Sequence, residues 1–126
     1  MEIKNWNGSQ GDLRRIIQES VPGKQITMAH IIASPDEVIY KKLGLDPKVD
    51  YHRSAIGVLT LTPSETAIIT ADLAIKASNI QIGFIDRFSG TLIITGTISD
   101  VNIAFERILE YTSSELDFTV CRITKA

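Results

Sequence analysis

The chain has 126 residues, which suits one domain with a hydrophobic core of its own. Hydrophobic residues make up 44% of it, as is typical of a globular protein, and 13 basic against 15 acidic residues leave a formal net charge of -2. This near-balance excludes the strongly basic surface of nucleic-acid-binding and membrane-surface proteins, so we expect no nucleic acid and no membrane as partners.

The first third of the sequence predicts a tail, a strand and a short helix. Residues 1–15 are polar, which is typical of a mobile N-terminal tail. Residues 26–33 (ITMAHIIA) form an apolar run that predicts a strand. The residues that follow predict a short helix, capped by Ser34, with Pro35 at its first position and a stop at Gly44.

The middle of the chain predicts a strand followed by a helix. Residues 55–61 (AIGVLTL) are branched and small, which indicates a strand. Residues 62–65 (TPSE) are a capping-box pattern, so we expect a helix from Pro63 to about Ser78. That helix is apolar around most of its circumference, and we expect a neighbouring subunit to cover its outer side. The alternative is that one or two isoleucines are simply exposed.

The last third predicts a hairpin, a helix and a strand. Residues 80–85 and 91–98 are predicted strands, joined by a loop that contains glycine, residues 86–90. The pair Ser99-Asp100 is predicted to cap a helix whose apolar residues, spaced by three and four, mark one buried stripe. Residues 118–124 predict the last strand.

These elements predict an α+β fold. Residues 55–124 follow the order β-α-β-β-α-β, which is the ferredoxin-like arrangement of two helices on one face of an antiparallel sheet. An extra N-terminal strand and a short helix precede this core. We expect a single domain over residues 16–126.

The sequence contains no recognisable catalytic or metal-binding motif. Two histidines, His30 and His52, are too few for most histidine-rich sites, and a zinc-binding CxxC pair is absent. Glycine-rich phosphate loops are absent too. The lone cysteine, Cys121, lies in an apolar stretch, which indicates a small buried side chain in a reducing cytosol. We therefore expect a protein that is not an enzyme, with no cofactor and no bound metal.

Two long segments, IIQESVPGKQITMAHIIASP and AIGVLTLTPSETAIITADLAIKASNIQIGFIDRFSGTLIITG, resemble the circularly permuted shell proteins of bacterial microcompartments (BMC). The resemblance covers residues 13–126 and is to the ethanolamine- and propanediol-utilisation types; choline-utilisation microcompartments carry similar subunits. It implies a cytoplasmic homo-hexamer that tiles with other shell proteins into a shell and can meet the encapsulated enzymes. It leaves open whether residues 26–33 or 118–124 take the usual position in the sheet of the permuted BMC domain.

The resemblance also implies roles for particular residues. LAIKASNI matches the end of the family's helix at the hexamer rim, so Lys76 is the candidate for the lateral contact between hexamers. The loop DRFSG matches the turn around the central pore, so we expect Arg87, Phe88, Ser89 and Gly90 to ring the axis. Six copies of this turn would form a narrow constriction.

A third role falls on the N-terminal segment. In the permuted branch of the family, residues like 16–25 form a small parallel β-barrel over the axis, with one strand from each subunit. The candidate barrel residues here are Ile17, Gln18, Glu19 and Val21. Closing the ring removes the free edges of a lone strand, and such a cap would obstruct diffusion through the pore.

Two other functions stay open at the level of sequence. The first is an oligomeric, small-molecule-binding regulatory module on the same ferredoxin-like fold, because a fold alone does not decide a function. The second is an enzyme that uses His30 or Cys121 with a metal or an acid/base partner. A ring that associates into sheets favours the shell protein, and a small oligomer with a saturable ligand favours the regulatory module.

Overall fold

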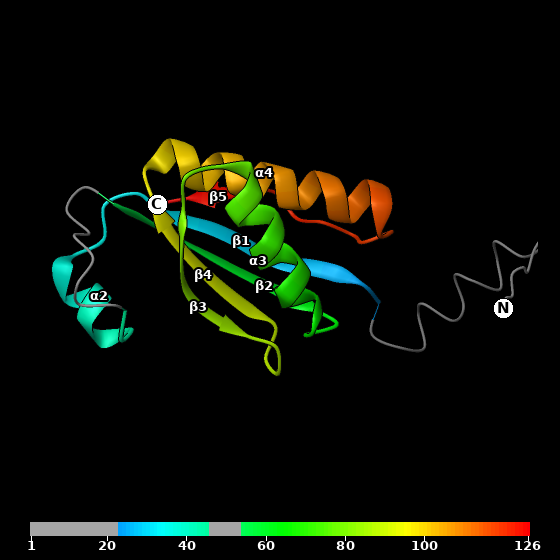
Figure 1. The fold of residues 1–126 in the computed structure, drawn as a ribbon, viewed down its shortest axis with the longest axis horizontal. Helices are drawn as coiled ribbons and strands as arrows, with labels where there is room; N and C mark the ends of the chain where they lie inside the picture. The colour runs from blue at the N-terminus through cyan, green and yellow to red at the C-terminus, as the bar shows by residue number, and fades with distance from the viewer. Residues whose placement is uncertain (1–22, 46–53) are drawn as a thin grey trace, which may run out of the picture.

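A computed structural model describes residues 23–45 and 54–126 as one mixed sheet with helices packed on it (Figure 1). The strands are β1 (Gln25–Ile32), β2 (Ala55–Thr62), β3 (Gln81–Asp86), β4 (Thr91–Gly96) and β5 (Thr124–Lys125). The helices are α2 (Glu37–Lys42), α3 (Thr66–Ala77) and α4 (Ile98–Glu115). The predicted α+β fold class is confirmed, with the extra strand and short helix ahead of the core.

The order of the strands shows how the N-terminal strand joins the sheet. The order is β3-β4-β2-β1-β5. The strands from β3 to β1 run antiparallel to their neighbours, whereas β5 pairs parallel with β1 over two residue pairs. Of the two candidate segments, residues 26–33 and 118–124, the first therefore lies beside β2, as β1. It does so with seven paired residues, from Gln25↔Thr62 to Ile32↔Ile56.

The predicted strand over residues 118–124 is wrong for most of its length. The segment meets β1 near its two ends, where Thr119 makes two backbone hydrogen bonds of 2.9 Å and Thr124 pairs with His30. The residues between these points that pack against the main core are Val120, Cys121 and Ile123. The segment does not form a continuous ladder of hydrogen bonds with β1. In a regular strand, every second side chain would point to the opposite face of the sheet and away from this core.

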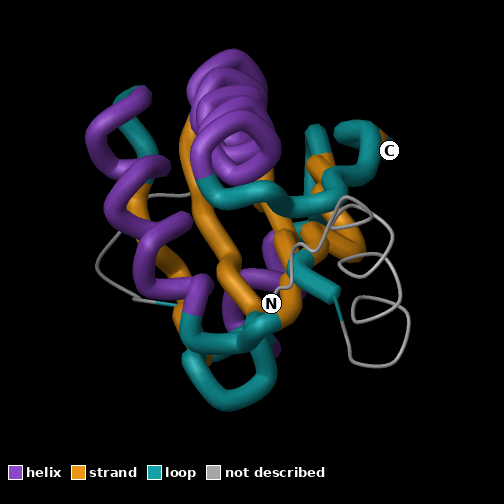
Figure 2. Tube along the Cα trace, turned by 90° about the vertical axis from the view of Figure 1, so that its right-hand side faces the viewer, coloured by secondary structure: helices purple, strands orange, loops and turns teal. Residues whose placement is uncertain are grey.

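The main core lies between the sheet and the two long helices. Helices α3 and α4 cover the same face of the sheet (Figure 2). The predicted stripe on α4 is confirmed, since its residues Val101, Ala104, Phe105 and Ile108 are fully buried. The helix approaches β2 so closely at Gly57 that a Cβ atom there would lie 2.7 Å from the Phe105 ring.

The opposite face of the sheet has a second, smaller cluster. Tyr40 of α2 and the nearby Leu45 pack on Ile56 and Ile93 from β2 and β4. The Tyr40 hydroxyl also donates a 2.8 Å hydrogen bond to the Ser54 carbonyl. Figure 1 places α2 at the end of the sheet away from the β3–β4 turn. Among the described residues, the helix therefore covers only one end of this face.

Helix α2 begins later than predicted. Its cap is Asp36, whose carboxylate accepts a 3.0 Å hydrogen bond from the Val38 N–H. Ser34 and Pro35 precede the helix, which agrees with the extended backbone that a residue before proline prefers. The predicted stop is confirmed, because Gly44 follows the last turn with a positive φ of 71°.

Helix α3 also begins later than predicted, at Thr66 rather than Pro63. The predicted cap, Thr62, is still the last residue of β2 and pairs with Gln25. The N–H groups of residues 66–68 bond to carbonyls three residues earlier, at 3.0 to 3.2 Å, so a tighter turn precedes the regular helix. Because Thr62 is paired within the sheet, the helix starts later than the capping pattern predicts.

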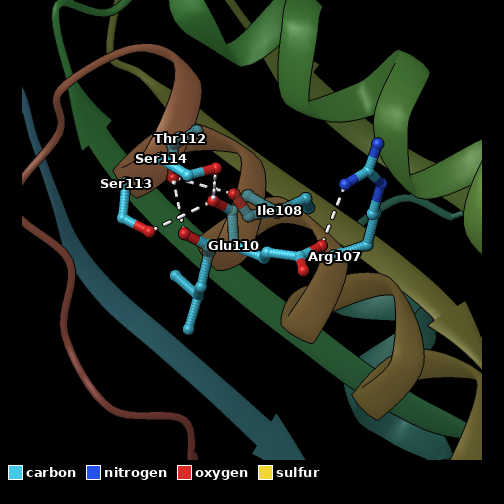
Figure 3. A network of polar contacts seen from close by, with 7 residues as sticks. Arg107, Ile108, Glu110, Thr112, Ser113 and Ser114 are labelled. Atoms are coloured by element: carbon cyan, nitrogen blue, oxygen red, sulfur yellow. Dashed lines mark hydrogen bonds and ion pairs between the residues drawn. The ribbon is translucent and has the colours of Figure 1, made fainter.

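Helix α4 begins before the predicted cap. Thr97 is the N-cap, and its hydroxyl oxygen accepts a 3.0 Å hydrogen bond from the Asp100 N–H. Strand β4 accordingly ends at Gly96, and the two residues after it that were expected in the strand belong to the helix start. At the other end, the Thr112 hydroxyl bonds to the Ile108 carbonyl at 2.7 Å (Figure 3). This bond gives the buried hydroxyl a partner within the helix itself.

Candidate functional site

The residues with catalytic potential do not converge within the described part of the chain. Nδ1 of His30 lies 2.6 Å from the Thr124 hydroxyl and so joins β1 to β5. Cys121 is partly buried against the main core. In residues 23–45 and 54–126, no group of His, Cys, Asp or Glu side chains is arranged to hold a metal ion. Within the same ranges, no helix is both long and apolar enough to cross a membrane. His52 lies outside them.

The turn between β3 and β4 combines an exposed aromatic ring with a positive charge. Phe88 is 79% exposed, and the Arg87 guanidinium lies 4.9 Å from the centre of its ring. The Asp86 carboxylate accepts a 2.9 Å hydrogen bond from the Phe88 N–H. This bond, followed by one from the Ser89 side chain, lowers the pKa of Asp86. The turn therefore presents a cation–π pair on a backbone held by its own hydrogen bonds.

Gly90 ties this turn to the junction between β2 and α3. Its φ is 75°, its N–H donates to the Asp86 carbonyl, and its carbonyl accepts from the Leu61 N–H, both at 2.9 Å. A Cβ atom at position 90 would overlap the Leu61 carbonyl oxygen and lie 3.1 Å from Cα of Ser64. Only glycine fits here without strain. The four predicted pore residues thus form one turn with a fixed backbone.

Helix α3 presents a mixed apolar and charged face to the outside. We call this the outer face of α3; its residues are Ile68, Ile69, Asp72, Ile75 and Lys76, all exposed. Nζ of Lys76 lies 2.9 Å from Oδ2 of Asp72, one helical turn earlier. The expectation that this helix is apolar on both sides is confirmed, since Ile68 and Ile75 are more than half exposed while Ala67 and Ala74 are fully buried.

Helix α2 also turns apolar side chains outward. Val38 and Ile39 of the helix and Leu43 at its C-cap are exposed. Tyr40, which sequence reasoning missed, is the buried anchor. The sequence feature that could have indicated this role is the tyrosine itself, whose long side chain with a terminal hydroxyl can reach both the sheet and a backbone carbonyl.

The two sets of predicted contact residues lie at opposite ends of α3. The turn meets the chain at Ser64, and Lys76 is in the last turn of the helix. Lys76 lies ten residues along the helix from its first residue, Thr66, a distance of roughly 15 Å. The structure therefore does not bring Lys76 near the turn. The predicted barrel residues Ile17, Gln18, Glu19 and Val21 lie outside the described residues.

Comparison with known proteins shows the family of the chain. The model of the BMC domain matches residues 55–123, which is more than half of the sequence. The chain belongs to the BMC-domain family. Two relatives that are named as bacterial microcompartment shell proteins agree with this assignment. CutR of Streptococcus intermedius is 53% identical over 92% of this chain and 96% of its own length. PduU of Salmonella typhimurium is 48% identical over 88% of this chain and 92% of its own length.

The fold of this BMC-domain chain agrees with the sequence comparison. A solved CutR flat hexamer matches it with a TM-score of 0.77 and 54% identity, over 89% of this chain and 99% of the CutR chain. The BMC-domain match begins at residue 55, yet β1, which precedes it, fills the place beside β2. A strand that comes first in the chain but lies inside the sheet is consistent with a circularly permuted domain.

Proposed function

We propose that six copies of this chain close into a ring, and that such rings tile with other shell proteins into the wall of a bacterial microcompartment. The wall would enclose a pathway of the ethanolamine, propanediol or choline type. The chain would act as a barrier subunit and not as an enzyme, without a cofactor, while encapsulated enzymes carry out the reactions. The observation that carries this proposal is the match to the CutR flat hexamer over 89% of the chain.

In this proposal the β3–β4 turn lies at the axis of the ring. Arg87, Phe88, Ser89 and Gly90 of six subunits would line a constriction, and the hydrogen bonds of Gly90 would hold its backbone fixed. The side chains of Arg87 and Phe88 would then set its width. With the turn at the axis, Lys76 at the opposite end of α3 would lie farther from the axis, as its predicted role at the rim requires.

We also propose that residues 16–25 form the barrel over the axis, with Ile17, Gln18, Glu19 and Val21 among its residues. The support is the place where the described chain begins. Gln25 pairs with Thr62, so β1 starts at the same end of the sheet as the β3–β4 turn. A segment that precedes β1 is therefore attached beside the proposed axis.

Oligomeric state tests the proposal. Native mass spectrometry of the full chain should show six copies, and electron microscopy of concentrated protein should show sheets or tubes built from rings. A monomer that persists at high concentration would contradict the shell function. A smaller oligomer whose melting temperature rises with a saturable metabolite would favour a regulatory module instead.

A cross-linking experiment tests the axial position of the turn. In a Cys121→Ser background, Ser89→Cys should give a ladder of cross-linked subunits up to the hexamer with a short bis-maleimide. Ser99→Cys is the matched control, because Ser99 is exposed in the first turn of α4, and the six residues of β4, roughly 20 Å long, separate it from the turn. Two results would contradict an axial position of the turn. One is intact rings that give no cross-linked products at position 89, and the other is equal cross-linking at positions 89 and 99.

A further inference from the structure

We infer that the segment just before β1, residues 16–22, docks on the β3–β4 turn and that its Glu19 carboxylate pairs with the Arg87 guanidinium. This contact would hold the proposed barrel on the constriction. The inference rests on the proposed function and deepens it, since it names the surface that binds the barrel and the charge that recognises it. Residues 16–22 lie outside the described residues, so the structural support comes from the turn and from the start of β1.

The β3–β4 turn presents a cation that has no acidic partner. Arg87 is exposed, and it forms no ion pair within residues 23–45 and 54–126. The neighbouring carboxylate, Asp86, is used within the turn itself, where it accepts a 2.9 Å hydrogen bond from the Phe88 N–H. In a ring of six subunits, six such guanidinium groups would face one axis. Like charges at such a site repel one another unless anions lie among them.

The aromatic ring beside this cation is also uncovered. Phe88 is 79% exposed, more than any other large apolar residue in the described part of the chain. One exposed phenylalanine on a subunit is unremarkable, but six of them around an axis would form a continuous apolar patch. A protein normally covers such a patch with another segment or partner. The turn therefore presents two features for a partner to match, a cation and an apolar ring, which lie 4.9 Å apart.

The sequence before β1 has the complementary pattern. In an extended strand every second side chain points to the same side, so Ile17, Glu19 and Val21 share one side. That side carries an acid between two apolar residues, which matches the cation and the ring of the turn. Glu19 is also the only acidic residue over residues 13–35. The charge pattern therefore identifies Glu19 as the partner of Arg87.

The start of β1 lies close enough to the turn for this contact. Gln25 pairs with Thr62 at the end of β2, and β2 lies between β1 and β4. Two strand spacings, roughly 10 Å, therefore separate the start of β1 from the end of the sheet that carries the turn. Glu19 precedes Gln25 by six residues, which span at most roughly 20 Å when extended. Glu19 can thus reach the turn of its own subunit or that of the next subunit around the axis.

The contact makes closure of the constriction depend on charge. Six carboxylates of the barrel repel one another, and so do six guanidinium groups of the turns, whereas the two sets together are neutral. Ile17 and Val21 against Phe88 would exclude water from the ion pairs, which strengthens them relative to pairs on an open surface. Because salt screens the part of this attraction that stays exposed, the barrel should loosen as ionic strength rises.

Charge reversal in the full-length protein tests the inference, with hydrogen–deuterium exchange of residues 16–22 as the measurement. We expect Glu19→Arg and Arg87→Glu each to speed this exchange about tenfold, since each places like charges together around the axis. The double variant should exchange within about threefold of the wild-type rate, because opposite charges meet again. Native mass spectrometry should show rings of six for all three variants.

Glu65→Lys is the matched control for these variants. Glu65 is an exposed acid next to Ser64, which lies against the turn at Gly90, yet it forms no ion pair with Arg87. Its reversal changes the charge near the turn by the same amount as Glu19→Arg. We expect it to leave the exchange of residues 16–22 unchanged.

Salt separates charge pairing from apolar packing. For the wild type, exchange of residues 16–22 should speed up between about 0.05 M and about 1 M sodium chloride, where the Debye length falls to roughly 3 Å. Glu19→Gln keeps the size of the side chain and removes its charge. Its exchange should be faster than that of the wild type at low salt and should lose most of the salt dependence.

Two outcomes would overturn the inference. The first is a double variant that exchanges as fast as the single ones, which would show that the two charges do not meet. The second is single variants that exchange as slowly as the wild type, which would place the barrel on another surface. In both cases wild-type rings with a protected segment would still form, so the proposed function would survive. Wild-type rings without protection at residues 16–22 would contradict the barrel and this contact together, and absence of rings would contradict the shell function.

Discussion

Replacement of Gly90 by alanine should destabilise the protein strongly, because the added methyl group has no room. It would overlap the Leu61 carbonyl oxygen and press on Ser64, while the residue must keep a φ of 75°. The left-handed conformation costs a non-glycine residue about 1 kcal/mol, and forced overpacking costs about 1 to 3 kcal/mol. Weakening the hydrogen bond from the Leu61 N–H adds about 1 kcal/mol. We expect a loss of at least about 3 kcal/mol, a large part of a typical domain's stability.

Gly44→Ala is the control that isolates the clash. Gly44 has nearly the same φ, 71°, but no atom of the described residues, its two chain neighbours aside, lies within 4 Å of the position a Cβ would occupy. This variant should lose about 1 kcal/mol, from backbone conformation alone. In thermal melts at one fixed protein concentration, we expect Tm to fall by about 4 °C for Gly44→Ala and by about 10 °C for Gly90→Ala.

The difference between the two variants is the decisive quantity. Equal losses would mean that the contact with Leu61 costs nothing and that the turn can move away from the β2–α3 junction. In that case the turn would be flexible, and the proposed constriction would not have a fixed backbone. Cross-linking through Ser89→Cys, carried out in the Gly90→Ala background, should also weaken if the turn is displaced.

Two further predictions concern the core and the pH dependence. Gly57→Ala should cost about 1 to 3 kcal/mol in urea denaturation, because its methyl group would meet the Phe105 ring at 2.7 Å; an unchanged midpoint would show that α4 can shift. Asp86 should stabilise the folded state above about pH 4 and lose this effect as the pH falls through its lowered pKa, since hydrogen bonds from Phe88 and Ser89 favour the carboxylate. Asp86→Asn should therefore flatten the loss of Tm between pH 5 and pH 3, and wild-type-like acid sensitivity would assign that loss to other carboxylates.

Local pattern predicted the elements well and their boundaries poorly. The strands at residues 26–33 and 55–61 and the buried stripe on α4 follow from side-chain periodicity, which is a local property. The helix starts did not follow, because several residues near each start can cap. For α3, the predicted cap Thr62 is paired within the sheet. For α2, the carboxylate of Asp36, one residue after the proline, caps the helix instead of Ser34.

The candidate site was predictable only in part. Resemblance to the family predicts the roles of Lys76 and of the turn at residues 87–90, which stay predictions, and the structure places the two at opposite ends of α3. The ion pair between Lys76 and Asp72 needed the structure, because a spacing of four residues permits such a pair without requiring it. The structure was also needed to show that Val38 and Ile39 on α2 are exposed, since a helix of six residues is too short for a clear periodicity.

The sequence by itself determined the family, the α+β class and the identity of the long buried elements. The family follows from the resemblance of two long segments to known shell proteins. The fold class and the buried elements depend on the alternation of apolar and polar residues within a segment, which the chain carries wherever the segment lies. Tertiary structure decided which of two segments sits beside β2, because strands compete for one row of backbone partners. Seven residues of β1 pair with β2, whereas β5 forms two pairs, and the apolar side chains of the C-terminal segment are held by the core instead.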